Sequence, residues 1–247
     1  MIPFRDDNPT RTFPVVVVGL IAANVAIFIH QALMPEVGQV LFFYTYGAVP
    51  TVLLGKATLA QVLSPEVRSA AVSVDLRATQ LQPVWLTIFT SMFVHGGIAH
   101  LGGNMLYLWI FGNNVEDALG HARFIVFYFL CGCIAAGAQI AMSAGSPAPM
   151  VGASGAIAGV LGAYYMKFPR ARVQCLVLLF FFITIVYLPA GLVLLLWFLL
   201  QVWQSLLVGP HGAAGGVAVF AHIAGFLAGW ALVRGFEPKR RLRLSAW

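Results

Sequence analysis

A serine flanked by glycines opens an apolar stretch near the middle of the chain, in the order Gly152-Ala153-Ser154-Gly155. A serine hydroxyl becomes a useful nucleophile when a neighbouring base removes its proton, and histidine titrates in the range that this role requires. His222 lies in a later apolar stretch and could be that base. The serine motif alone has an alternative interpretation, because small residues and serine also favour close packing between membrane helices.

His100 and Asn104 could supply the hydrogen-bond donors that stabilise negative charge on an attacked carbonyl oxygen. They are four positions apart and would lie on one face of a helix, where the backbone N–H of Ser154 could join them. Interhelical hydrogen bonding is the alternative role for this pair. We expect His95 to shape the neighbouring loop or its hydrogen bonds. No metal or other cofactor is expected at His95, His100 and His222, because a His-Glu-x-x-His pattern and a nearby carboxylate are missing.

Glycines recur around the candidate nucleophile and base. Gly155 and Gly159 follow the serine, and Gly225 and Gly229 follow the histidine, in both cases at the small-xxx-small spacing that lets helix backbones approach closely. This approach would bring the hydroxyl and the imidazole within hydrogen-bond reach. We count these four residues and Gly152 as supporting residues of the site.

A carboxylate that orients His222, as in soluble catalytic triads, is not predicted. The sequence has no Asp or Glu between Ala118 and Phe236. Glu116 and Asp117 fall at the far end of their expected helix, at the other face of the membrane. The sequence therefore predicts a Ser–His dyad.

The composition places these groups in a membrane protein. Of 247 residues, 60% are hydrophobic and 9% are charged, and the mean hydropathy is +0.89, so the apolar side chains cannot all be hidden inside one water-soluble globule. The net charge of +6 comes from short basic clusters between apolar runs, which indicates membrane orientation and not nucleic-acid binding. The three cysteines are odd in number and lie in or beside apolar segments, so no disulfide framework is expected.

We predict an all-α, polytopic membrane protein with six transmembrane helices. The expected helices cover residues 14–33, 98–115, 124–142, 152–166, 190–207 and 217–234. The expected divisions are a polar N-terminal lead at 1–13, a membrane domain at 14–234 with a long first loop at 35–97, and a basic C-terminal tail at 235–247.

The distribution of Lys and Arg predicts the orientation of these helices. With six spans, all basic residues except Lys56, Arg68 and Arg77 fall on the side of the two termini, which should therefore be cytoplasmic. This orientation requires that residues 173–187 form a membrane-surface or re-entrant segment and not a further span. An added span would place the serine and the histidine at opposite faces of the membrane.

Three motifs, in this order, resemble the rhomboid family of intramembrane serine proteases. They are His95-Gly96-Gly97-Ile98-Ala99-His100-Leu101-Gly102-Gly103-Asn104-Met105, Gly152-Ala153-Ser154-Gly155, and Ala221-His222-Ile223-Ala224-Gly225 with Gly229. The resemblance implies a six-helix rhomboid core with Ser154 as nucleophile and His222 as general base. It also implies that His100 and Asn104 assist the oxyanion and that neither metal nor ATP is needed.

The family's substrates are membrane proteins cut in or near a transmembrane segment, so transmembrane proteins within the lipid bilayer are the expected partners. The resemblance implies a mobile gate helix at 190–207 and a cap loop at 208–216. We expect a bacterial inner-membrane protein whose active site opens to the non-cytoplasmic side. An inactive rhomboid-like chaperone or a small transporter is the alternative function.

The chain departs from the family pattern at three points, one of which is the extra apolar segment at 173–187, before the fifth expected helix. Leu86 follows Trp85 where relatives often have arginine, and the same loop carries a polar insertion. Ala158 stands four residues after the serine, where many relatives place an aromatic that packs beneath the histidine. The sequence alone therefore does not predict how His222 is held.

Overall fold

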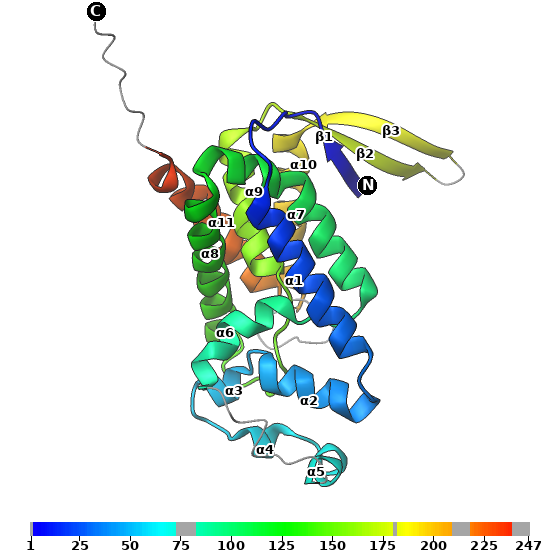
Figure 1. The fold of residues 1–247 in the computed structure, drawn as a ribbon, viewed down its shortest axis with the longest axis vertical. Helices are drawn as coiled ribbons and strands as arrows, with labels where there is room; N and C mark the ends of the chain where they lie inside the picture. The colour runs from blue at the N-terminus through cyan, green and yellow to red at the C-terminus, as the bar shows by residue number, and fades with distance from the viewer. Residues whose placement is uncertain (1, 73–82, 180–181, 209–217, 239–247) are drawn as a thin grey trace, which may run out of the picture.

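The computed structural model describes residues 2–72, 83–179, 182–208 and 218–238, which form a mostly helical bundle (Figure 1). The long helices of the bundle are α1 (Val15–Ala32), α7 (Ile98–Leu119), α8 (His121–Met142), α9 (Ser154–Lys167), α10 (Ala190–Val208) and α11 (Val219–Phe236). Each lies close to a range that the hydropathy pattern of the sequence predicts.

The length and composition of these helices make the chain a multi-pass integral membrane protein. Among the described residues, four helices are long and apolar enough to cross a bilayer, namely α1, α8, α10 and α11. A fifth crossing results if α7 is counted together with residues Val84–Phe93, from which it is bent by 81°. Helix α9 has only 14 residues and is about 21 Å long, and most of its side chains are buried among the other helices.

Helix α9 lies at the centre of the bundle, where α7, α8 and α11 pack around it. Glycines permit the closest of these contacts. A Cβ atom at Gly229 of α11 would overlap with the carbonyl oxygen of Gly159, and one at Gly162 would overlap with that of Phe226. The backbones of α9 and α11 therefore touch, as the spacing of small residues in the sequence indicates.

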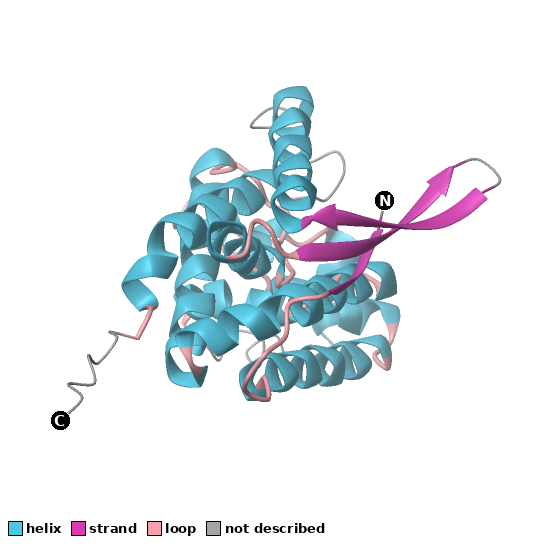
Figure 2. Ribbon diagram, turned by 90° about the horizontal axis from the view of Figure 1, so that it is seen from above, coloured by secondary structure: helices cyan, strands magenta, loops and turns pink. Residues whose placement is uncertain are grey.

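A three-stranded antiparallel sheet lies at one end of the bundle, so the all-α prediction is wrong at this point. The strands are β1 (Ile2–Asp6), β2 (Arg172–Leu179) and β3 (Phe182–Pro189), in the order β1-β2-β3, and the β2–β3 hairpin projects sideways (Figure 2). The sequence predicts a membrane-surface or re-entrant segment at 173–187, and the described residues of this range, 173–179 and 182–187, lie in β2 and β3. Their many β-branched and aromatic residues favour strands when a partner strand is at hand. Here β2 and β3 pair with each other, and the N-terminal lead adds β1 at the other edge of β2.

The hairpin adds no further crossing of the bundle. The N–H groups of Ala190 and Gly191, where α10 begins, donate hydrogen bonds to the carbonyl oxygens of Ala171 and Pro169, 2.7 and 2.9 Å away. The end of α9 and the start of α10 therefore lie side by side at the sheet end of the bundle. The serine that begins α9 and the first turn of α11 consequently share the other end.

The described parts of the first loop, residues 35–72 and 83–97, lie largely at the end of the bundle opposite the sheet (Figure 1). They contain the short helices α2 (Glu36–Tyr46), α3 (Pro50–Leu53), α4 (Leu59–Val62), α5 (Pro65–Val72) and α6 (Thr87–Thr90), with 3-10 turns at Val84–Leu86 and Ser91–Phe93. A bridge between Ala48 and Met150 joins this loop to the segment before α9. The expected cap loop, apart from Val208, and the basic tail from residue 239 onward lie outside the described residues.

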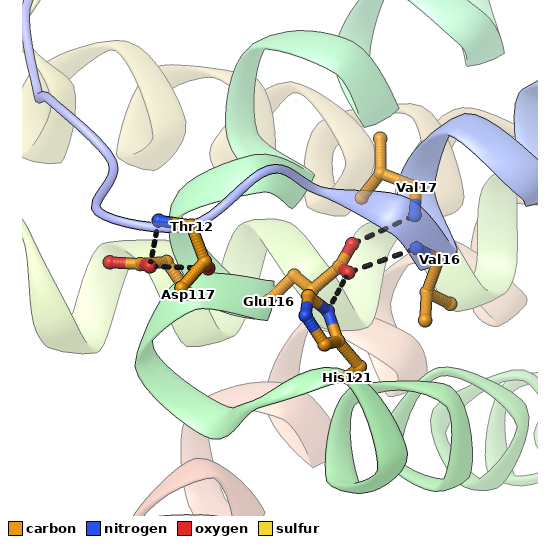
Figure 3. A network of polar contacts seen from close by, with 6 residues as sticks. All are labelled: Thr12, Val16, Val17, Glu116, Asp117 and His121. Atoms are coloured by element: carbon orange, nitrogen blue, oxygen red, sulfur yellow. Dashed lines mark hydrogen bonds and ion pairs between the residues drawn. The ribbon is translucent and has the colours of Figure 1, made fainter.

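A buried carboxylate connects α7, α8 and α1 near the sheet end (Figure 3). Glu116 is fully buried, and its two oxygens accept hydrogen bonds from the backbone N–H groups of Val16 and Val17, 2.9 and 2.8 Å away. Nδ1 of His121 donates a hydrogen bond to the same carboxylate. Glu116 therefore satisfies N–H groups at the start of α1 from a different helix, at a position where negative charge is favourable.

Candidate active site

Ser154 and His222 lie within hydrogen-bond distance of each other. Ser154 is the first residue of α9, His222 is in the first turn of α11, and the distance from Ser154 Oγ to His222 Nε2 is 2.8 Å. Glycines permit this approach, because a Cβ atom at Gly225 would overlap with the carbonyl oxygen of Gly155. A hydroxyl hydrogen-bonded to an imidazole is the arrangement that a serine nucleophile and its general base require.

His222 is also contacted from α10. Its Nδ1 atom lies 2.7 Å from Oε1 of Gln201, whose side chain is buried. The indole ring of Trp197, one turn earlier on α10, has a centroid 5.8 Å from that of the imidazole. Sequence reasoning missed Gln201. An amide within a strongly apolar helix is the signal that could have identified it, since such a group needs a partner inside the protein.

Ala158 lies in the contact between α9 and α11. It is fully buried, and a Cβ atom placed at Gly225 would be only 3.2 Å from the Cβ atom of Ala158. A larger side chain at this position would push α11 away from α9. The aromatic contact to His222 comes instead from Trp197 on α10.

His95 and Asn104 form a second polar cluster beside the serine and histidine. Nδ2 of Asn104 lies 2.9 Å from Nε2 of His95, so the amide donates a hydrogen bond to the ring. The carbonyl oxygen of His95 in turn accepts a hydrogen bond of 2.8 Å from Nε2 of Gln31. The His95 ring is fully buried, with its centroid 5.1 Å from that of His100. Gln31 of α1 is a member of this cluster that the sequence analysis did not single out.

Gly152 brings the segment before α9 against the ring of His100. Its φ angle is +119°, a conformation that favours glycine, and a Cβ atom here would lie 2.7 Å from Nε2 of His100. The N–H group of Gly152 donates a 2.8 Å hydrogen bond to the carbonyl oxygen of Ser91. Any larger residue would therefore displace either His100 or the start of α9.

A cavity of about 490 Å³ opens beside Ser154. Its polar wall is formed by His100, Asn104, Ser154 and His222, and apolar side chains of α7, α9 and α10 form much of the remainder. A carbonyl group placed in this cavity would face the serine hydroxyl and the hydrogen-bond donors of α7 together. This is the geometry that acyl transfer needs.

The fold and these side chains define a multi-pass membrane protein with a paired serine and histidine at one end of its bundle. Residues 82–237 match the model of the Rhomboid domain, and the chain belongs to the rhomboid family. The resemblance drawn from the three sequence motifs is therefore confirmed.

Three curated relatives illustrate the match. Rhomboid protease GluP of Bacillus subtilis is 44% identical over 82 residues, which cover 33% of this chain and 16% of GluP. The mitochondrial rhomboid protein 1 of Saccharomyces cerevisiae is 32% identical over 178 residues, or 65% of this chain and 46% of that protein. The human mitochondrial presenilin-associated rhomboid-like protein is 33% identical over 96 residues, or 38% of this chain and 25% of that protein. The chain spans less than half the length of each relative.

Proposed function

We propose that the chain is an intramembrane serine endopeptidase that hydrolyses peptide bonds in or near transmembrane segments of other membrane proteins. The observation that carries this proposal is the 2.8 Å contact between Ser154 Oγ and His222 Nε2 at the wall of a cavity. Membership of the rhomboid family supports it, as does a relative whose name is rhomboid protease.

In the proposed reaction, Nε2 of His222 removes the proton from Ser154 Oγ as this oxygen attacks the carbonyl carbon of the scissile peptide bond. The tetrahedral intermediate then collapses while the imidazolium donates its proton to the leaving nitrogen. The C–N bond breaks and an acyl-enzyme remains. Water, deprotonated by the same imidazole, hydrolyses the ester and restores the serine.

The proposed donors to the oxyanion are Nδ2 of Asn104, a ring nitrogen of His100 and the backbone N–H of Ser154. These groups border the same cavity. The bond from Asn104 to His95 uses one of the two N–H groups of the amide and directs the side chain, so the second N–H can serve the oxyanion. His95 therefore has a positioning role in this proposal.

We propose six membrane crossings, made by α1, α7, α8, α9, α10 and α11, with both termini in the cytoplasm and the cavity open to the other side. The excess of Lys and Arg in the terminal segments and in the connections at the sheet end supports this orientation. The proposed location is the inner membrane of a bacterium, where transmembrane proteins in the same bilayer would be the substrates.

Fluorophosphonate labelling and peptide cleavage test the proposal together. The purified protein in liposomes is treated with a fluorescent fluorophosphonate and, separately, with a transmembrane peptide containing a Gly- and Ala-rich segment. We expect Ser154→Ala and His222→Ala to lower both rates by about 10⁴-fold or more. Ser143→Ala is the control, because Ser143 Oγ bonds to the carbonyl oxygen of Gln139 at the end of α8, and it should behave as the wild type.

Labelling and cleavage that persist in Ser154→Ala would contradict the proposal. A wild-type protein that neither reacts with the fluorophosphonate nor cuts the peptide, although it is folded, would instead favour the inactive alternatives.

A further inference from the structure

The base of the proposed dyad is bound by a neutral side chain from a third helix. Gln201 of α10 is 6% exposed, and its Oε1 atom lies 2.7 Å from Nδ1 of His222. Nε2 of the same ring lies 2.8 Å from Ser154 Oγ. The three side chains therefore form a continuous hydrogen-bonded chain across α10, α11 and α9.

This chain of hydrogen bonds defines which ring nitrogen carries the proton. An amide oxygen accepts hydrogen bonds and cannot donate them, so Nδ1 of His222 must carry the hydrogen. Nε2 then presents its lone pair to the hydroxyl of Ser154, as a general base must. The opposite tautomer would direct an N–H group at the hydroxyl and could not take its proton.

We propose that Gln201 is the positioning residue that fixes the orientation and the tautomer of His222, the role that a carboxylate has in soluble triads. This inference rests on the proposed proteolytic function and adds a residue to it. The sequence has no Asp or Glu between Ala118 and Phe236, and the amide oxygen of Gln201 is the acceptor that the structure places at Nδ1 instead.

The surroundings of Gln201 support this role. Much of α10 carries exposed apolar side chains, for example Leu199, Leu200 and Leu206, which are 50 to 73% exposed. A buried amide in such a helix costs free energy unless it is hydrogen-bonded, and the bond to His222 compensates for this cost.

Aromatic contacts hold the helix that carries Gln201 against the helix that carries the base. The ring of Phe198 stacks on that of Phe226 of α11 at 4.7 Å, and Trp197 contacts the ring of His222. Because Gln201 belongs to α10, the orientation of the base depends on the position of that helix.

Two substitutions of Gln201 and one matched control test the proposal by fluorophosphonate labelling in liposomes of phosphatidylethanolamine and phosphatidylglycerol. Gln201→Met keeps the size of the side chain and removes the acceptor, whereas Gln201→Glu keeps an acceptor oxygen. Gln204→Met is the control, since it makes the same change three residues later on α10. Melting temperatures of all variants establish that they are folded.

We expect Gln201→Met to lower the maximal labelling rate about 10- to 100-fold, because a misoriented base loses much of its effect, while the half-saturating probe concentration stays within about twofold. Gln201→Glu should recover most of the rate. Its carboxylate stabilises the protonated imidazole, so labelling should rise at a higher pH than in the wild type. Within the described residues, His100 and Tyr107 are the titratable side chains that share the cavity with His222, and both are identical in all variants.

A Gln201→Met protein that labels as fast as Gln204→Met would overturn the proposal. The proposal would also be overturned if Gln201→Glu had the slow labelling rate of Gln201→Met and the pH profile of the wild type. Gln201 would then have only a structural role. If Gln201→Met does not fold, the pH profile of labelling of Gln201→Glu decides alone. A shift of this profile to higher pH would support the proposal, and an unchanged profile would contradict it. If the proposed proteolytic function were itself wrong, the folded wild-type protein would not be labelled by the fluorophosphonate.

Discussion

Replacement of Glu116 by alanine should destabilise the protein more than replacement of the neighbouring Asp117. The Glu116 carboxylate is fully buried and receives the N–H groups of Val16 and Val17 in the first turn of α1 (Figure 3). Alanine would leave both donors without this partner at the point where α1 enters the bundle. The substitution therefore tests whether a carboxylate of α7 anchors the first helix.

The size of the effect follows from these two donors. A buried N–H group left without a partner costs about 1 to 3 kcal/mol. Val17 is fully buried and should show the full cost, whereas Val16 is partly exposed, so water can replace some of its lost bond. The side chain of His121 is 47% exposed, and its ion pair adds little. The expected loss for Glu116→Ala is about 3 to 4 kcal/mol, and Glu116→Gln, which keeps one acceptor oxygen, should lose roughly half of that.

Reversible unfolding with sodium dodecyl sulfate in mixed micelles, followed by far-ultraviolet circular dichroism, measures this difference. Asp117→Ala is the matched control, because Asp117 accepts bonds of 2.9 and 2.7 Å from the N–H and hydroxyl groups of Thr12 in an exposed setting. Water can replace both bonds, so the control should lose about 1 kcal/mol or less. Equal stability of Glu116→Ala and Asp117→Ala would refute the reasoning.

Two further changes probe the helix contact and the sheet. Gly229→Ala should destabilise the protein by at least about 2 kcal/mol and lower fluorophosphonate labelling, because the new Cβ atom would overlap with the carbonyl oxygen of Gly159. Gly235→Ala is the control. It places a Cβ atom in open space and should be neutral or slightly stabilising in the same unfolding assay. Burial raises the pKa of the Asp6 carboxyl above its ordinary value of 3.8, and the hydrogen bond from Tyr164 only partly offsets this effect. Between pH 3.8 and the raised pKa, the Asp6 carboxyl has lost its proton in the unfolded chain and retains it in the folded protein. The free energy of unfolding of the wild type should therefore fall relative to that of Asp6→Asn as the pH rises through this range. Unfolding free energies that run parallel over this range would contradict the assignment.

The helix positions could be predicted from the sequence because membrane helices satisfy their own backbone hydrogen bonds, so their local hydropathy is sufficient evidence. The pairing of Ser154 with His222 could be predicted from the motifs and from the requirement that both lie at the same face. The strands could not, because an apolar run such as 173–187 is compatible with helix and strand alike. In the structure the two halves of this run pair with each other as β2 and β3, and β1, from the opposite end of the sequence, pairs with the other edge of β2.

The contacts of Gln201 and Glu116 could not be predicted from the sequence, for a related reason. Both are polar groups whose partner lies on another helix, so their roles depend on how the helices are rotated and displaced relative to one another. Hydropathy locates a span and does not determine its rotation about its own axis. The position of Asn104 on the same helix face as His100 was predictable, because the helical repeat fixes the spacing of the two residues, whereas its hydrogen bond to His95 was not predicted.

The contact of Gln201 with His222 brings a neutral amide, and not a carboxylate, to the imidazole ring. Asp6, Glu116 and Asp117 all lie at or near the sheet end, away from His222. A carboxylate beside a buried imidazole would stabilise its protonated form, which cannot accept the proton of a serine. In the proposed reaction, the amide of Gln201 would direct the ring without adding charge beside it. The pH profile of Gln201→Glu therefore measures what the neutrality of the amide contributes to the proposed reaction.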